Sequence, residues 1–414
     1  AEMGLELVKG VWVLKMDMVA TTALAAVLLM LGYQLRKRVS VFDKFCIPAP
    51  VLGGFAFSLL ALFCKQMGLI TFTFTTTLQS PFMIAFFTTV GIGGSLALLK
   101  KGGSGLIIYL VSCWFIAVFQ NAFGSGLASM LGIHPVLGMM AVAVSLEGGH
   151  GAAAAFGPTA EALGVKGATA VAIASATYGL IAGGLLGGPI AKWLIGKYNV
   201  AIKAGEGDYE TYDQAIGADK EAGTVTSRNI LFMMMLVLVI MTFGAWGSAK
   251  LKAATGFDLP GYVGAMFVAI ILRNINDGVK MVKLHLKSLD IIADVSIGIF
   301  LTMAMMTLRI WELYDLALPL IIILLLQTIA LALFAIFILF RALGKDYDAV
   351  VMVAGLMGHG LGATPNAVAN MGAVCERYGV MSHKAFLIIP LCGAVLIDLV
   401  GIPNIVWFIN YLTK

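Results

Sequence analysis

Long apolar stretches separated by short polar segments dominate this chain of 414 residues. The hydrocarbon core of a bilayer is about 30 Å thick and requires roughly 20 apolar residues in a helix, so such stretches predict membrane-spanning helices. Ten stretches qualify or nearly qualify, and they lie near residues 16–35, 48–64, 81–99, 106–130, 168–191, 229–249, 259–272, 291–308, 316–340 and 385–411. The pattern therefore predicts an all-α polytopic membrane protein with about ten transmembrane helices.

The composition excludes several other classes of protein. Hydrophobic residues make up 60% and charged residues 12% of the chain, and the mean hydropathy is +0.97. Ordinary soluble domains carry about 25% charged residues. A soluble enzyme, a disordered protein and a nucleic-acid binder are therefore excluded, and we expect lipid as a partner and no nucleic acid.

The basic residues are distributed unevenly between the segments that join the apolar stretches. With the N-terminus outside, most of the 27 lysines and arginines fall in inner loops, as the positive-inside rule requires. Both termini are then expected outside, and the long hydrophilic segment 192–228 is expected to be a cytoplasmic linker between two halves. A basic cluster, and no small-residue cleavage site, follows the first apolar run, so we expect no cleavable signal peptide.

The two halves of the chain are weakly similar. Residues of one half recur about 209 positions later in the pairs Gly149-His150-Gly151 and Gly358-His359-Gly360, Gln120 and Gln327, Pro50 and Pro260, and Lys100 and Arg309. This predicts an N-terminal repeat over 1–191 and a C-terminal repeat over 229–414. Each repeat has five spans, an odd number, so the two would insert in opposite directions, as is common in secondary transporters. Channels and membrane enzymes can also be duplicated.

Two glycine-rich segments, near 136–160 and 350–372, are too broken for a plain span and too apolar for a surface loop. In lipid, non-helical backbone survives only inside protein or along a wet cavity. We therefore expect two re-entrant hairpins that enter from opposite sides and meet near the middle of the membrane. The alternative is that the glycines only permit close packing of helices.

The hairpin tips have the chemistry to bind an anionic substrate. Clustered glycines expose backbone N–H and C=O groups, and helices that begin there direct their positive ends toward a carboxylate. The two histidines are expected to donate hydrogen bonds and not to ligate a metal. The candidate substrate-binding residues are Gly148, Gly149, His150, Gly151, His359, Gly360, Gly362, Ala363, Thr364, Pro365 and Asn366.

Exposed carbonyls and buried side-chain oxygens near the tips suit sodium, a hard cation. Asp398 lies inside the last span, where an acid is costly and indicates a functional role in sodium coordination or proton linkage. The candidate sodium-binding residues are Ser145, Glu147, Asn121, Thr364, Asn370 and Asp398. We expect no transition metal and no cofactor besides the coupling ion. Gln120, Asn121 and Gln327 could line the path or only join helices, and Asp294 is expected at a membrane interface.

Several motifs resemble the bacterial sodium/glutamate symporters. They are Gly148-Gly149-His150-Gly151, Gly360-Leu361-Gly362-Ala363-Thr364-Pro365, Ala369-Asn370-Met371, Gly344-Lys345-Asp346-Tyr347-Asp348-Ala349, Ile47-Pro48-Ala49-Pro50 with Gly53-Gly54, and Gln120-Asn121-Ala122 with Gly124. The resemblance covers about residues 20–405. It implies a ten-helix, two-domain carrier with inverted repeats, a homodimer, and sodium-driven glutamate uptake across the bacterial inner membrane. It also implies elevator-like alternating access, and it places the family's re-entrant motifs on Gly148 to Gly151 and Gly358 to Pro365.

The sequence departs from that family at Glu147, where the family has a small hydroxyl residue, typically serine. A carboxylate beside an anionic substrate repels it unless the carboxylate is protonated, paired or bound to a cation. Glu147 therefore indicates a sodium or proton site, or a substrate other than glutamate. The alternatives are a sodium- or proton-coupled carrier for another small organic anion or amino acid and, with less support, a channel or an intramembrane enzyme; we expect no enzyme activity.

Overall fold

A computed structural model describes residues 3–8, 10–44, 47–100, 102–203, 205, 224–257 and 259–413. The helices of the N-terminal half are α1 (Met18–Arg38), α2 (Ser40–Lys44), α3 (Ala49–Gln66), α4 (Gln79–Gly93), η1 (Leu96–Lys100), α5 (Gly103–Met130), α6 (Pro135–Ala141), η2 (Ala143–Glu147), α7 (Gly149–Ala162) and α8 (Ala168–Tyr198). Most of the expected linker, residues 204 and 206–223, lies outside the described residues.

The C-terminal half follows a similar order of helices. They are α10 (Ser227–Thr255), α11 (Gly261–Val279), α12 (Leu286–Met306), η4 (Ile310–Leu313), α13 (Ala317–Phe334), η5 (Ala335–Leu339), α14 (Phe340–Ala342), α15 (Tyr347–His359), α16 (Thr364–Tyr378), α17 (His383–Leu391), η6 (Cys392–Leu396) and α18 (Asp398–Leu412). The segments η2, η5 and η6 are π-helical turns, whereas η1 and η4 are 3₁₀ turns.

Seven helices of the described chain are long and apolar enough to cross a membrane: α1, α3, α5, α8, α10, α12 and the continuous α13–α14 segment. They coincide with seven of the ten predicted stretches. The other three are less regular: α4 has 15 residues, α11 carries Arg273 and Asp277 in its C-terminal half, and η6 separates α17 from α18. The chain is therefore a mostly helical, multi-pass membrane protein.

The expectation of an all-α chain is wrong at the N-terminus. Strands β1 (Gly4–Val8) and β2 (Val11–Met16) pair antiparallel, and β3 (Ile70–Phe74) adds to β2 in parallel. Apolar and polar residues alternate in β1 and β3, a period of two that suits a half-buried strand. The rings of Phe72 and Phe74 pack on Phe57 in the middle of α3, so one side of this small sheet covers part of that helix.

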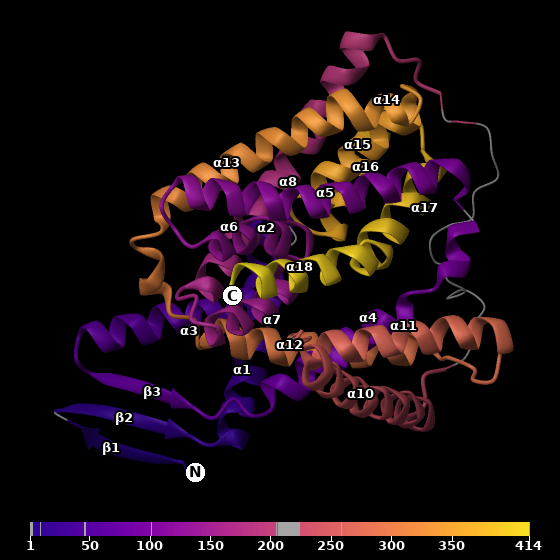
Figure 1. Ribbon diagram of the computed structural model, residues 1–414. Coiled ribbons are helices and arrows are strands. Elements are labelled where there is room, and N and C mark those ends of the chain that lie inside the picture. The colour runs from indigo at the N-terminus through magenta and orange to yellow at the C-terminus, as the bar shows by residue number, and fades with distance from the viewer. Residues whose placement is uncertain are drawn as a thin grey trace.

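Helices from both halves of the chain are mixed in two bundles. Bundle A consists of α1, α3, α4, α10, α11 and α12, in which α3 packs against α12 and α4 against α11. Bundle B consists of α5 to α8 and α13 to α18, in which α8 packs against α7, α15 and α16. Figure 1 shows bundle A below bundle B, with α7 lying directly above α12. Each bundle thus takes helices from both sequence halves.

Glycines allow the helices to approach closely at several crossings. In bundle A, a Cβ atom on Gly53 of α3 would overlap the carbonyl oxygen of Leu28 in α1. In bundle B, a Cβ atom on Gly179 of α8 would overlap the carbonyl oxygen of Leu361. In lipid there is no hydrophobic driving force between helices, so their association depends on van der Waals packing, which small residues permit. Close packing of helices therefore accounts for the glycines at these two positions.

Candidate functional site

A cavity of about 440 Å³ lies at the interface of the two bundles. The residues that bundle A contributes to its lining are Tyr33, Arg36, Pro48, Ala49, Pro50, Phe86, Phe87, Val90, Asp294, Ile297, Gly298 and Leu301. The residues that bundle B contributes are Glu147, Gly148, Gly149, His150, Gly151, Ala152, Leu180, Gly362, Ala363, Thr364, Pro365, Gly393, Asp398 and Ile402. Both glycine-rich segments of the sequence therefore reach the same cavity.

The first glycine-rich segment changes direction where it meets the cavity. Helix α6 ends at Ala141, the π-helical turn η2 ends at Glu147, and α7 begins at Gly149, whose φ of +64° lies in the left-handed region that favours glycine. The first N–H groups of a helix have no partner within the helix. The start of α7 therefore presents unpaired donors and the positive end of its dipole beside the cavity.

The second glycine-rich segment breaks between α15, which ends at His359, and α16, which begins at Thr364. The N–H groups of Gly362 and Ala363 donate to the carbonyl oxygen of Gly358, at 2.9 and 3.1 Å. Pro365 suits the first turn of α16 because it has no N–H to leave unpaired. A second helix N-terminus thus reaches the cavity lining.

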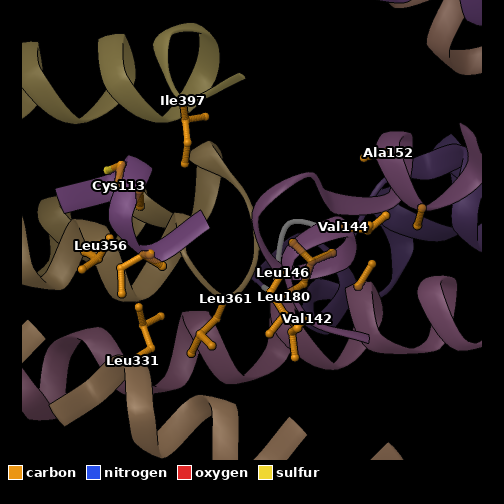
Figure 2. Packing of buried hydrophobic residues seen from close by; sticks show 14 of the residues in the cluster. Cys113, Val142, Val144, Leu146, Ala152, Leu180, Leu331, Leu356, Leu361 and Ile397 are labelled. Atoms are coloured by element: carbon orange, nitrogen blue, oxygen red, sulfur yellow. The ribbon is translucent and has the colours of Figure 1, made fainter. Parts of the chain in front are cut away.

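The two breaks lie side by side. A Cβ atom on Gly149 would be 3.8 Å from the carbonyl oxygen of Gly362. Behind them, Gly179 of α8 contacts both Leu361 and the side chain of Leu146. Figure 2 shows Leu146 and Leu361 among the buried apolar side chains next to Leu180. The glycine of α8 therefore sets the position of both segments.

Glu147 and Asp398 bring two carboxyl groups to the cavity. Glu147 ends η2, and Asp398 begins α18 directly after the turn η6. The two groups are near enough to interact electrostatically. Within the described chain, neither carboxyl group has a hydrogen-bond or ion-pair partner. Isolated ionised carboxylates are costly in such a position, so the pair favours binding of a cation.

His150 is held in one orientation by the helix behind it. Its Nε2 lies 3.0 Å from the hydroxyl oxygen of Thr177, and that hydroxyl donates to the carbonyl oxygen of Ile173 at 3.1 Å. A hydroxyl has one proton to donate, so Nε2 of His150 carries the proton of this hydrogen bond. The ring is 5% exposed. It therefore has one nitrogen committed to α8, and its Nδ1 is left for other contacts.

Three of the candidate substrate-binding residues do not line the cavity. His359 is buried, and its Nε2 hydrogen-bonds the hydroxyl group of Tyr109 in α5. The carbonyl oxygen of Gly360 accepts a hydrogen bond of 3.3 Å from Gln120, also in α5. The Nδ2 of Asn366 donates to the carbonyl oxygen of Leu180 at 2.7 Å. These residues fix the second break against α5 and α8.

Three of the candidate sodium-binding residues also lie away from the cavity lining. Ser145 donates to the carbonyl oxygen of Met140 within its own segment. The Nδ2 of Asn121 donates to Oδ1 of Asn404 at 2.6 Å and so joins α5 to α18. The Nδ2 of Asn370 donates to Gly183 in α8 at 2.9 Å. The other three candidate sodium-binding residues, Glu147, Thr364 and Asp398, do line the cavity.

Sequence reasoning missed several lining residues from bundle A. Asp294 was expected at an interface, yet it lines the cavity opposite the glycine segments, together with Arg36 and Tyr33. An acid inside a predicted span was the available signal for Asp294. The motif around Pro48 and Pro50 does not by itself indicate that this segment lines a cavity. Position along a span gives depth but not the face of the helix, so the contacts between bundles could not be read from the sequence.

A cavity between two helical bundles, with helix N-termini and unpartnered carboxyl groups on one side, is the arrangement of a membrane solute carrier. The sequence model of the family described as sodium/glutamate symporter matches residues 14–380. The chain is similar to the sodium/glutamate symporter of Haemophilus influenzae, with 40% identity over 382 residues that cover 92% of this chain and 94% of the relative. It is 40% identical to that of Escherichia coli over 387 residues, which cover 93% and 96% of the two chains.

The chain therefore belongs to the sodium/glutamate symporter family. The family that the motifs around Gly148 and Gly360 indicated is confirmed. It is a family of transporters, so a carrier, and not an enzyme, is the class to which this protein belongs.

Proposed function

We propose that this protein couples sodium entry to the uptake of glutamate or a closely similar acidic amino acid. The observation that supports this most is the convergence of two helix N-termini and two unpartnered carboxyl groups on one cavity between the bundles. Membership of the family supports both the substrate and the coupling ion. A carrier for another small organic anion or amino acid is the alternative.

The helix N-termini supply the anion-binding part of the site. Glutamate has two carboxylates, and α7 and α16 each begin at the cavity with unpaired N–H groups and a positive dipole end. In our proposal one carboxylate binds Gly149–Gly151. The other binds at the end of the second turn through the N–H group and hydroxyl of Thr364, because the N–H groups of Gly362 and Ala363 already donate to Gly358. The remaining substrate candidates, His359, Gly360 and Asn366, support this second turn from behind.

The carboxyl groups supply the cation-binding part. Bringing an anionic substrate next to Glu147 and Asp398 is unfavourable unless a positive charge is bound with it. Sodium between these carboxylates, with the hydroxyl of Thr364 within the same cavity, would remove the repulsion. Each ligand then raises the affinity for the other, which is the thermodynamic basis of coupling. Ser145, Asn121 and Asn370 would act by holding the surrounding backbone.

The order of the helices supports an inverted repeat with ten spans. Segments α1, α3, α4, α5, α6–α7 and α8 of the first half correspond in order to α10, α11, α12, α13–α14, α15–α16 and α17–α18 of the second. The crossing of α3 with α12 corresponds to that of α11 with α4. We propose that the two broken segments are re-entrant hairpins and that the repeats cover 1–191 and 229–414.

The same scheme places the protein in the bacterial inner membrane. We propose termini outside, the 192–228 linker in the cytoplasm, and a homodimer. Bundle B carries most of the proposed site and would move against bundle A, in the manner of an elevator. The glycines of α8 that closely approach other segments do so within bundle B. This bundle can therefore move as one body.

Uptake by purified protein in proteoliposomes tests the proposed function. An inward sodium gradient is expected to drive glutamate accumulation. Replacing sodium with potassium is expected to reduce the uptake by about tenfold or more, because typical coupling energies correspond to changes in affinity of this size. Competition by aspartate, glutamine and dicarboxylates without an amino group reports the substrate class. Uptake that is the same in potassium would refute sodium coupling, and competition by glutamine equal to that by glutamate would refute selection of an acidic amino acid.

A further inference from the structure

A second, smaller cavity of about 220 Å³ also lies between the two bundles. Its lining includes, from bundle A, Gln79, Ala304 and Thr307 and, from bundle B, Pro158, Glu161 and Thr169. Much of this lining is polar. Glu161 accepts a hydrogen bond of 2.9 Å from the N–H group of Thr169, and Arg309 forms an ion pair of 3.5 Å with Glu312. This small cavity shares no lining residue with the main cavity described above, so the proposed site does not account for it.

The two cavities lie toward opposite ends of the same helices. On α4, the first residue, Gln79, lines the small cavity, and Val90 near the last turn lines the main cavity. On α12, Ile297 lines the main cavity, and Thr307 directly after the helix lines the small one. The first turn of α7 lies at the main cavity, and its last turn, with Glu161, lies at the small cavity. The interface between the bundles therefore has one cavity toward each end.

Five aromatic rings, which we call the aromatic barrier, separate the two cavities. In the order of their contacts they are Phe300, Phe86, Phe87 and Tyr262 of bundle A and Phe156 of bundle B. The centroids of successive rings are 6.1, 5.4, 5.0 and 5.4 Å apart, so the chain of rings crosses from one bundle to the other. Phe300, Tyr262 and Phe156 are at most 4% exposed. The interface is therefore closed between the cavities.

Helix α7 packs on this barrier at two places. A Cβ atom on Gly151 would lie 3.5 Å from the ring of Phe86, in van der Waals contact. Farther along the helix, the hydroxyl group of Tyr262 donates to Oγ1 of Thr159 at 3.3 Å, because the one proton of Thr159 goes to the carbonyl oxygen of Ala155 at 3.0 Å. This hydrogen bond joins bundle B to bundle A beside the barrier.

We propose that the small cavity is the second entrance of the transport pathway, and that the aromatic barrier, held by the hydrogen bond between Tyr262 and Thr159, closes it in this structure. This inference rests on the proposed function, because it concerns the route by which an acidic amino acid and sodium reach the main cavity. Alternating access requires the site to be reached from each side of the membrane in turn. The main cavity already reaches the end of α1 and the start of α3, at Arg36 and Pro48. Movement of α7 along the barrier brings Gly149–Gly151 to the other entrance.

Modification of two introduced cysteines by a charged, membrane-impermeant thiol reagent tests the two entrances without any transport. Ile297→Cys places a thiol at the main cavity and Thr307→Cys places one at the small cavity, and both positions are partly exposed. The reagent is applied to intact cells and to inside-out vesicles, and the wild type treated in the same way accounts for the native cysteines. The two thiols are expected to react from opposite faces of the membrane. Reaction of both from the same face would overturn the proposal.

A charged group attached in the small cavity is expected to block the pathway, so modified Thr307→Cys is expected to lose most of its sodium-driven glutamate uptake. Ser129→Cys is the matched control. Ser129 is exposed in the last turn of α5, which begins after the end of α4 and so ends on the side of the molecule where α4 begins. This thiol is expected to react from the same face as Thr307→Cys without loss of uptake. Wild-type uptake by fully modified Thr307→Cys would show that solute does not pass through the small cavity.

Tyr262→Phe tests the hydrogen bond, because it keeps the ring and removes the donor to Thr159. A thiol in Ala152→Cys, on α7 at the main cavity, reaches the face of the small cavity only after bundle B has moved. Tyr262→Phe is expected to raise its rate of reaction from that face about two- to tenfold, which corresponds to the net contribution of one hydrogen bond. Tyr347→Phe removes a 2.8 Å hydrogen bond to Val380 within bundle B and is expected to leave this rate unchanged.

An unchanged rate in Tyr262→Phe, or an equal rise in Tyr347→Phe, would overturn the role of the hydrogen bond between the bundles. Wild-type protein without sodium-driven glutamate uptake would instead refute the proposed function, whichever face each thiol reacts from.

Discussion

Gly179→Ala is expected to abolish glutamate uptake in protein that still reaches the membrane. The added methyl group would overlap the carbonyl oxygen of Leu361, which is backbone and has no rotamer to give way. Overpacking of this kind costs about 1–3 kcal/mol, and the simplest relief is a shift of the turn that carries Gly362. A displacement of about 1 Å in a binding site can reduce a rate about 100-fold, so we expect a loss of that size.

Gly188→Ala provides the matched control for this variant. It lies on the same helix, α8, and a Cβ atom there would meet nothing within 4 Å. Uptake and expression are expected to equal those of the wild type, apart from a small gain in helix propensity. Initial rates of uptake, normalised to protein in the membrane, distinguish the two. Wild-type uptake by Gly179→Ala would show that α8 does not position the turn.

Asp398→Asn is expected to uncouple glutamate uptake from sodium. The substitution keeps the size of the side chain and removes one of the two carboxylates that bundle B places at the cavity. A sodium ion would then lose half of the charge that holds it beside Glu147. Coupling energies correspond to a change in affinity of about 5–150-fold. We therefore expect the rate of uptake at limiting sodium to decrease by a factor in this range. The measurement is the sodium dependence of uptake at fixed glutamate.

Asp294→Asn is the control for the charge of the cavity. Asp294 also lines it, but it belongs to α12 of bundle A and its side chain is more exposed than those of Glu147 and Asp398. An exposed charge that does not contact the ion contributes little, about 0–1 kcal/mol, so we expect less than a tenfold effect on half-saturating sodium. An equal effect of the two substitutions would contradict a specific role for Asp398 and would leave only the net charge of the cavity.

The sequence predicted the helices best where they are long and uniformly apolar. Helices α5 and α8 are examples, because a run of that length has few alternatives to a membrane helix. It predicted α4 and α17–α18 less well, since a 15-residue helix and a π-helical turn do not follow a simple length rule. The small N-terminal sheet was missed because its strands are short and border the first span.

The site was predicted in part for a related reason. The glycine clusters around Gly149 and Gly362 indicated both breaks, because backbone that cannot stay helical in lipid needs a protein-lined space. The direction of single side chains was not available. Thr364 and Asn366 are two positions apart, which is about 200° around a helix, so one lines the cavity while the other faces α8. Which of the two side chains faces the cavity depends on how α16 crosses α8, and the sequence does not give that crossing.

Glutamate-stimulated entry of radiolabelled sodium is the most direct test of the central claim, that both solutes bind one cavity between bundles A and B. Reciprocity of linkage requires that glutamate promote sodium transport as sodium promotes glutamate transport. In proteoliposomes, external glutamate is expected to raise the initial rate of sodium entry several-fold in the wild type and to have no effect in Asp398→Asn. Glutamate entry that leaves the rate of sodium entry unchanged in the wild type would contradict the account.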